Sequence, residues 1–155
     1  MKFKSILAVL VFSVLGACMT AKPQMTPLEI QSLQTREFSS NKDVVFASTM
    51  SVMQDLGYTV TSADKDTGLI AAESATDSNG ALLFWTGTSQ TNQTRATAYI
   101  ERIKGKTSVR FNFVEKMETS SGYGRSNRND KPILDAAVYQ NAFERLENAI
   151  FVRRN

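Results

Sequence analysis

The chain of 155 residues carries 18 basic and 15 acidic residues, one cysteine and no histidine. The lack of histidine excludes His-based nucleophilic triads and His/Cys zinc sites, and it removes the commonest general base near neutral pH. A lone cysteine cannot form an intramolecular disulfide. The length suits one domain with a substantial core, and we expect no enzymatic activity, metal or cofactor, although lysine, tyrosine or carboxylate chemistry stays open.

Residues 1–17 have the features of a secretory signal peptide. Lys2 and Lys4 form a basic n-region, and residues 5–17 are almost wholly apolar. As a helix this stretch would span about 20 Å, whereas a bilayer core is roughly 30 Å thick. The length therefore favours a signal h-region over the alternative, a membrane-spanning N-terminus with a buried cysteine.

The sequence L-G-A-C at residues 15–18 resembles the lipobox of bacterial lipoproteins. This resemblance implies cleavage between Ala17 and Cys18, a diacylglycerol on the Cys18 thiol and an acyl chain on its new amine. Met19 stands where inner-membrane lipoproteins usually carry Asp. The resemblance thus implies an outer-membrane protein that is held by lipid on Cys18 and faces the periplasm.

Removal of the signal peptide also changes the charge of the chain. Without Lys2 and Lys4 the net charge falls from +3 to +1. Nucleic-acid binding needs a clustered basic face, so we expect no nucleic-acid partner. Pro23 and Pro27 disfavour regular structure, so residues 18–27 are predicted to be a lipidated tether before a single domain at 28–155.

The first part of that domain is predicted to be a strand followed by a helix. Apolar and polar residues alternate after Leu28, which predicts a strand over 28–38. Ser40 and Asp43 have the spacing of a capping box, and Gly57 suits the end of the helix that follows. An apolar stripe runs along this helix and comprises Val45, Phe46, Met50, Val52, Met53 and Leu56.

Two further strands are predicted at 58–63 and 69–74, joined by A-D-K-D-T-G. Asp64 and Asp66 before Gly68 could suggest half of a calcium loop. The distal ligands of such a loop are missing at the required spacing. A turn between strands explains these residues better.

The segment 76–92 contains the apolar run A-L-L-F-W between polar flanks. One interpretation is an exposed loop that touches a partner, a ligand or the membrane. The other is the start of a strand or a flap over the core. The candidate contact residues in this segment are Leu82, Leu83, Phe84 and Trp85.

Two long antiparallel strands are predicted at 94–103 and 108–114, joined by a turn at Gly105. Residues 119–131 are predicted to be a polar loop. Within it, Tyr123, Arg125 and Arg128 are candidates for binding a carboxylate or phosphate, and a solvated connection is the alternative.

A last helix is predicted to start at Pro132, with a stripe formed by Tyr139, Phe143, Leu146 and Ile150. The order of elements is therefore β-α-β-β-β-β-α. Short connections between strands indicate an antiparallel sheet, and one stripe per helix places both helices on one sheet face. The predicted fold class is a two-layer, helix-grip-like α+β domain.

The sequence Q-D-L-G-Y-T-V followed by A-D-K-D-T-G-L-I-A-A resembles the helix-grip modules in the C subunit of the β-barrel assembly machinery. With Y-Q-N-A-F-E-R-L-E-N-A-I-F, the pattern is more similar to small bacterial lipoproteins without a characterised function. The resemblance implies no catalytic residue. We expect a non-enzymatic accessory or binding subunit in an envelope complex; the alternative is a lipoprotein that binds a lipid or another small molecule.

Overall fold

The structure is a computed structural model that describes residues 25–78, 88–122 and 124–154. Its elements are α2 (Pro27–Gln34), β1 (Thr35–Phe38), α3 (Lys42–Asp55), β2 (Tyr58–Asp64), β3 (Leu69–Ser74), β4 (Asp77–Ser78), β5 (Thr88–Ile103), β6 (Lys106–Ser121), β7 (Ser126–Pro132) and α5 (Ala136–Arg154). None of the three described helices is long and apolar enough to cross a membrane.

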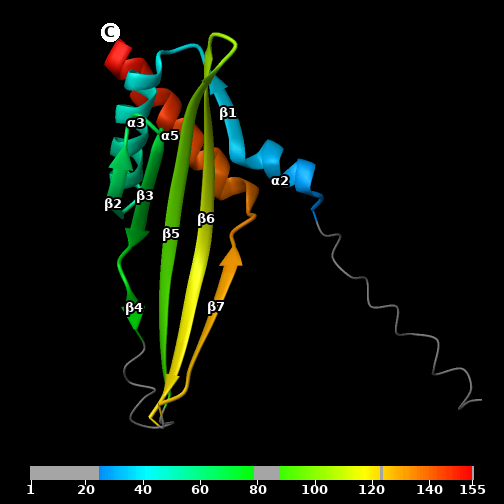
Figure 1. Ribbon diagram of the computed structural model, residues 1–155, viewed down its shortest axis with the longest axis vertical. Coiled ribbons are helices and arrows are strands. Elements are labelled where there is room, and N and C mark those ends of the chain that lie inside the picture. The colour runs from blue at the N-terminus through cyan, green and yellow to red at the C-terminus, as the bar shows by residue number, and fades with distance from the viewer. Residues whose placement is uncertain (1–24, 79–87, 123, 155) are drawn as a thin grey trace, which may run out of the picture.

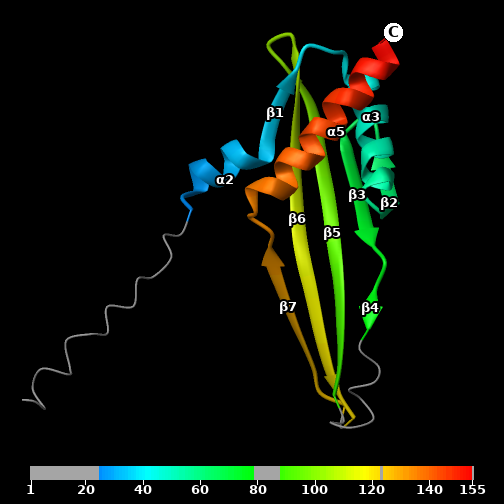
Figure 2. The ribbon, with the colours of Figure 1, turned by 180° about the vertical axis from the view of Figure 1, so that it is seen from behind.

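One antiparallel sheet organises the domain, with the strand order β1-β6-β5-β3-β2. β4 adds to β5 beyond β3, and β7 adds to β6 beyond β1. The helices α3 and α5 cover one face of the sheet (Figures 1 and 2). The predicted two-layer α+β class is therefore confirmed.

The core lies between the sheet and these two helices, as the apolar stripes predicted. The side chains that are no more than 2% exposed include Val45, Val52, Met53, Phe111, Phe113, Tyr139, Phe143 and Leu146. Aromatic rings fill the centre, with 5.1 Å between the centroids of Phe111 and Phe143 and 5.3 Å between those of Phe113 and Tyr139. Pairs at this spacing stabilise a core beyond the burial of their area.

The prediction of a strand over residues 28–34 was wrong, because these residues form α2. Thr26 Oγ1 accepts a hydrogen bond from Glu29 N at 3.3 Å, and Thr26 N donates to Glu29 Oε2 at 2.7 Å. This is a capping box, and Pro27 occupies the first turn, where its missing N–H is harmless. The helix thus begins inside the segment predicted as tether, and only Thr35–Phe38 forms the strand.

Buried Gln34 fixes the end of α2 against the domain. Its Oε1 accepts hydrogen bonds from Arg110 Nε at 3.2 Å and from Arg110 Nη2 at 2.9 Å. Its Nε2 lies 3.4 Å from Asn112 Oδ1 and 3.5 Å from the Tyr139 hydroxyl. Since β6 and α5 both contribute partners, this amide joins the first helix to both layers.

Two helix starts differ from the predictions. Asn41, not Ser40, caps α3, and its Oδ1 accepts from Val44 N at 2.8 Å. The last helix begins at Ala136 and not at Pro132, which pairs with Val114 at the end of β7. The predicted end of α3 is confirmed, because Gly57 has the positive φ of +85° that suits this position.

The β5–β6 hairpin is longer than the sequence predicted. The expected strands at 94–103 and 108–114 form part of two 16-residue strands, Thr88–Ile103 and Lys106–Ser121. The polar loop predicted over 119–131 was also largely wrong, because it holds the end of β6 and most of β7. These parts of β6 and β7 lack apolar alternation because no core covers them. Only their pairing identifies them as strands.

Candidate functional site

The far half of the long hairpin forms the arm, which we define as residues 77–78, 88–93, 115–121 and 125–132. In the described structure no helix lies over either face of this part of the sheet (Figures 1 and 2). β7 pairs with β6 from Val114 to Ser120, and at about 3.4 Å per residue its seven residues span about 24 Å. The arm therefore projects well beyond the helix-covered core.

Composition explains why the arm stays uncovered. The β5 part reads T-S-Q-T-N-Q, and all seven residues of β7 are exposed. Polar side chains on both faces give no apolar stripe for a helix to bury. Local bonds order these side chains: the Ser89 and Ser120 hydroxyl oxygens are 2.9 Å apart.

Charged residues gather where the arm meets the core, on the sheet face away from the helices. Glu73 Oε1 accepts from Lys116 Nζ at 2.8 Å and from Arg95 Nη2 at 2.8 Å. Gln93 Nε2 lies 3.4 Å from Glu73 Oε2. The hydrogen bond from Lys116 and then that from Arg95 lower the pKa of Glu73 to about 2. This carboxylate therefore binds three neighbours on β5 and β6 and stays ionised.

Glu73→Gln should reduce stability near neutral pH, with a loss that shrinks in acid. Because the pKa of Glu73 is lower in the folded state, its carboxylate stabilises that state at pH values above the ordinary pKa of 4.5. This stabilisation is lost as the pH falls toward the folded-state pKa of about 2. Urea unfolding of both proteins near neutral pH and at about pH 2 measures the difference. Glu147→Gln, on the exposed side of α5, is the control. A deficit for Glu73→Gln that stays constant down to this acid pH would contradict the assignment.

The structure brings two of the predicted contact residues to the arm. Arg128 Nε lies 2.9 Å from Asp130 Oδ1, and this ion pair raises the pKa of Arg128. Arg128 also lines a hollow of about 120 Å³ with Thr91, Gln93, Lys116 and Glu118. Arg125 lines a wider hollow of about 590 Å³ with Thr119, Ser121, Gly124, Ser126 and Asn127.

Arg125 directly precedes β7 and Arg128 lies on β7, and the two side chains line separate hollows. The other predicted residues, namely Ala17, Cys18, Leu82, Leu83, Phe84, Trp85 and Tyr123, lie outside the described residues.

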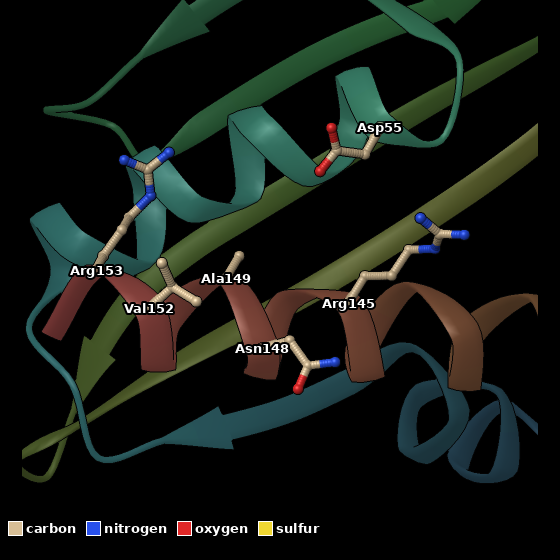
Figure 3. Close-up of a pocket in the computed structure, with 6 residues that line it drawn as sticks. All are labelled: Asp55, Arg145, Asn148, Ala149, Val152 and Arg153. Atoms are coloured by element: carbon tan, nitrogen blue, oxygen red, sulfur yellow. The ribbon is translucent and has the colours of Figure 1, made fainter. Parts of the chain in front are cut away.

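A second hollow region, which the sequence did not reveal, lies between α3 and α5. It is an open groove of about 480 Å³ lined by Asp55, Arg145, Asn148, Ala149, Val152 and Arg153 (Figure 3). Arg145 Nε bonds to Asn141 Oδ1 at 2.9 Å, and Arg153 donates to the Ser51 hydroxyl. The groove offers guanidinium groups over a small apolar floor. Only the pairing of two helices brings these residues together, so no sequence pattern could have indicated it.

The described residues contain no cluster of side chains typical of a metal site. Within residues 25–78, 88–122 and 124–154, no group of three or more acidic, histidine or cysteine side chains could hold a metal ion. Asp64, one of the two residues that could suggest a calcium loop, accepts from Asp66 N at 2.9 Å and Thr67 N at 3.4 Å. These are the bonds of a turn between strands, which is the interpretation the sequence favoured.

Comparison with known proteins adds little to this geometry. No protein-family model matches the chain. No curated protein matches its sequence. Among solved structures, the chain is similar to the crystal structure of a DUF4468 family protein from Bacteroides ovatus, with a TM-score of 0.39 and 11% sequence identity over 85% of this chain and 91% of that one. A similarity of this size gives no information on partners or activity.

Proposed function

We propose that the protein is an outer-membrane lipoprotein whose periplasmic domain is a non-enzymatic binding subunit of an envelope complex. The proposed location rests on the sequence, because L-G-A-C supplies a lipid attachment point at Cys18 and Met19 favours the outer membrane. The binding role rests on the arm, which is the observation that carries this proposal.

The arm has the properties of a surface for a protein partner. Among the described residues nothing covers its two polar faces or pairs with the outer edge of β7, so a partner can form backbone hydrogen bonds along β7. Charged edges discourage random strand pairing, and Arg128, Asp130 and Lys131 supply those charges. A specific partner would have to match the charges of this edge.

The alternative, a binder of lipid or another small molecule, receives less support. Such a ligand would need space between the helices and the sheet, but Phe111, Phe113 and Tyr139 fill this layer and are no more than 1% exposed. The hollows described above are open grooves on the surface. Ligand pockets usually enclose most of the ligand, which these grooves could not do.

Purification of the tagged protein from detergent-solubilised membranes tests the proposal. We expect a protein partner to co-purify in stoichiometric amount. The double variant Asn127→Glu with Asn129→Glu should lose most of the co-purified partner, because it adds two negative charges to β7. Gln54→Glu with Gln140→Glu, on exposed positions of the helices, is the charge-matched control and should retain the partner. A solitary wild-type monomer, or loss of the partner in both variants, would count against an arm that binds a partner.

A further inference from the structure

Exposed apolar side chains are unevenly distributed over the domain. The large apolar residues that are at least 38% exposed are Met25, Leu28, Leu69, Tyr99, Ile103, Phe151 and Val152. None of them belongs to the described arm. Met25 and Leu28 lie at the start of α2, whereas Ile103 ends β5 and Phe151 and Val152 belong to the last turn of α5. The β5–β6 turn and the C-terminal end of α5 lie opposite the arm along the long axis (Figures 1 and 2).

We define the basic end as the β5–β6 turn, residues 102–105, together with the last turn of α5, residues 151–154. Phe151 and Val152 are 68% and 73% exposed there. The same two segments supply four cationic side chains, Arg102, Lys104, Arg153 and Arg154. Basic groups beside exposed apolar groups are the combination that binds the interface of anionic membranes.

Ion pairs within the described structure leave these four cations uncompensated. Nearby lysines do have partners: Lys106 Nζ lies 3.1 Å from Glu37 Oε2, and Lys65 Nζ lies 3.4 Å from Asp43 Oδ2. Arg102 Nη2 donates to the Gly105 carbonyl at 3.5 Å, and Arg153 donates to the Ser51 hydroxyl. The positive charge at the basic end therefore remains open to a negatively charged surface.

Acidic groups also lie near this end, on the β2–β3 turn and directly before Arg102 on β5. Asp64 and Asp66 belong to the β2–β3 turn, and Asp64 is engaged by the backbone of that turn. Glu101 pairs in register with Ser108 on the sheet face away from the helices. These positions are outside the two segments that form the basic end.

The length of the tether is compatible with contact between the basic end and the membrane. The seven peptide units from Cys18 to Met25 can reach about 25 Å. β1 rises about 13 Å toward the β5–β6 turn, and α2, which runs at an angle to it, adds about 12 Å (Figure 1). A lipid on Cys18 can thus lie at the level of the basic end.

We infer that the basic end rests on an anionic lipid surface and directs the arm away from the membrane. This inference rests on the proposed lipid anchor, and it adds an orientation that the anchor alone does not give. The lipid holds the domain at the bilayer, and the cations and exposed apolar side chains determine which end of the domain contacts it. The arm then points toward the periplasmic space, where a partner can reach it.

Depth measurements on the mature lipidated protein in vesicles of phosphatidylethanolamine and phosphatidylglycerol test this orientation. Acylation blocks the Cys18 thiol, so a cysteine introduced by Val152→Cys or Asn127→Cys is the only free thiol for a fluorophore. We expect nitroxide lipids to quench the label at position 152 severalfold more strongly than the label at 127. Raised salt should weaken this contrast, because it screens surface charge.

Charge variants separate the electrostatic contact from the anchor. Lys104→Glu with Arg154→Glu should remove most of the quenching at position 152, whereas Arg125→Glu with Lys131→Glu on the arm should not. Equal quenching at positions 152 and 127 in vesicle-bound protein would overturn the orientation and leave the anchor intact. Protein that lacks lipid and does not remain with the vesicles would instead overturn the proposed lipoprotein function and, with it, this inference.

Discussion

Gly68→Ala should destabilise the domain by about 3 kcal/mol, because alanine meets both a strained backbone and a steric clash at this position. Gly68 has a φ of +80°, and a Cβ built there would lie 1.9 Å from the carbonyl oxygen of Ile100. The Gly68 carbonyl accepts a hydrogen bond from Ile100 N at 2.8 Å, so the β2–β3 turn is held against β5. The clash cannot be relieved without moving a central strand.

Gly57→Ala provides a matched control for this prediction. Gly57 has a similar φ of +85°, but a Cβ there would meet no atom within 4 Å. Its substitution should therefore cost only about 1 kcal/mol from the backbone conformation. Urea unfolding at neutral pH measures both variants. Equal losses would show that the approach of Gly68 to Ile100 is not as close as the structure describes.

Cys18→Ala should release the protein from the membrane fraction and leave the domain folded. Each buried methylene contributes about 0.8 kcal/mol to membrane binding, so several acyl chains hold a protein that a single chain binds only marginally. Side chains of α3, α5 and the sheet form the buried core of the described residues, so we expect the fold to tolerate the substitution. Fractionation of cells measures attachment, and circular dichroism with thermal unfolding measures the fold.

The control for this variant is Met19→Ala, which keeps the cysteine and should keep the protein in the membrane fraction. The intact mass of the wild-type protein should correspond to a chain that begins at Cys18 and carries acyl groups. Persistent outer-membrane fractionation of Cys18→Ala would contradict the lipid anchor.

The helices and central strands were predictable because they have one apolar face. Phe46 and Met53 on α3, and Tyr139 and Phe143 on α5, follow the helical period and are buried. Val109, Phe111 and Phe113 alternate with Arg110 and Asn112, as expected for a strand with one covered face. In these elements the local pattern and the tertiary packing agree.

The arm was not predictable by the same reasoning. T-S-Q-T-N-Q and S-N-R-N-D-K have no apolar alternation, because both faces of those strands lie in solvent. Only the register of the β5–β6 hairpin extends pairing into them. For α2 the sequence does contain a signal, in Thr26, Pro27 and Glu29, but the alternation after Leu28 competes with it and favours a strand.

The candidate site was predictable only in part. Arg125 and Arg128 were identified as basic groups in a polar segment, and the structure places both on the arm. The partnership of Arg128 with Asp130 depends on neighbouring side chains of a strand that was not predicted. The groove of Arg145 and Asp55 depends on the approach of two helices that are far apart in the sequence.

Photo-crosslinking in intact cells tests the central claim, a lipid-anchored domain that presents its arm to a protein partner. A photoreactive amino acid would replace Asn129 on the exposed face of β7 or, for comparison, Tyr99 on the sheet over the core. The account predicts one dominant protein adduct from position 129. The same adduct should be weaker when the photoreactive residue is at position 99, and it should be lost in Cys18→Ala. Adducts that are equally strong from both positions, or no protein adduct from position 129, would contradict it.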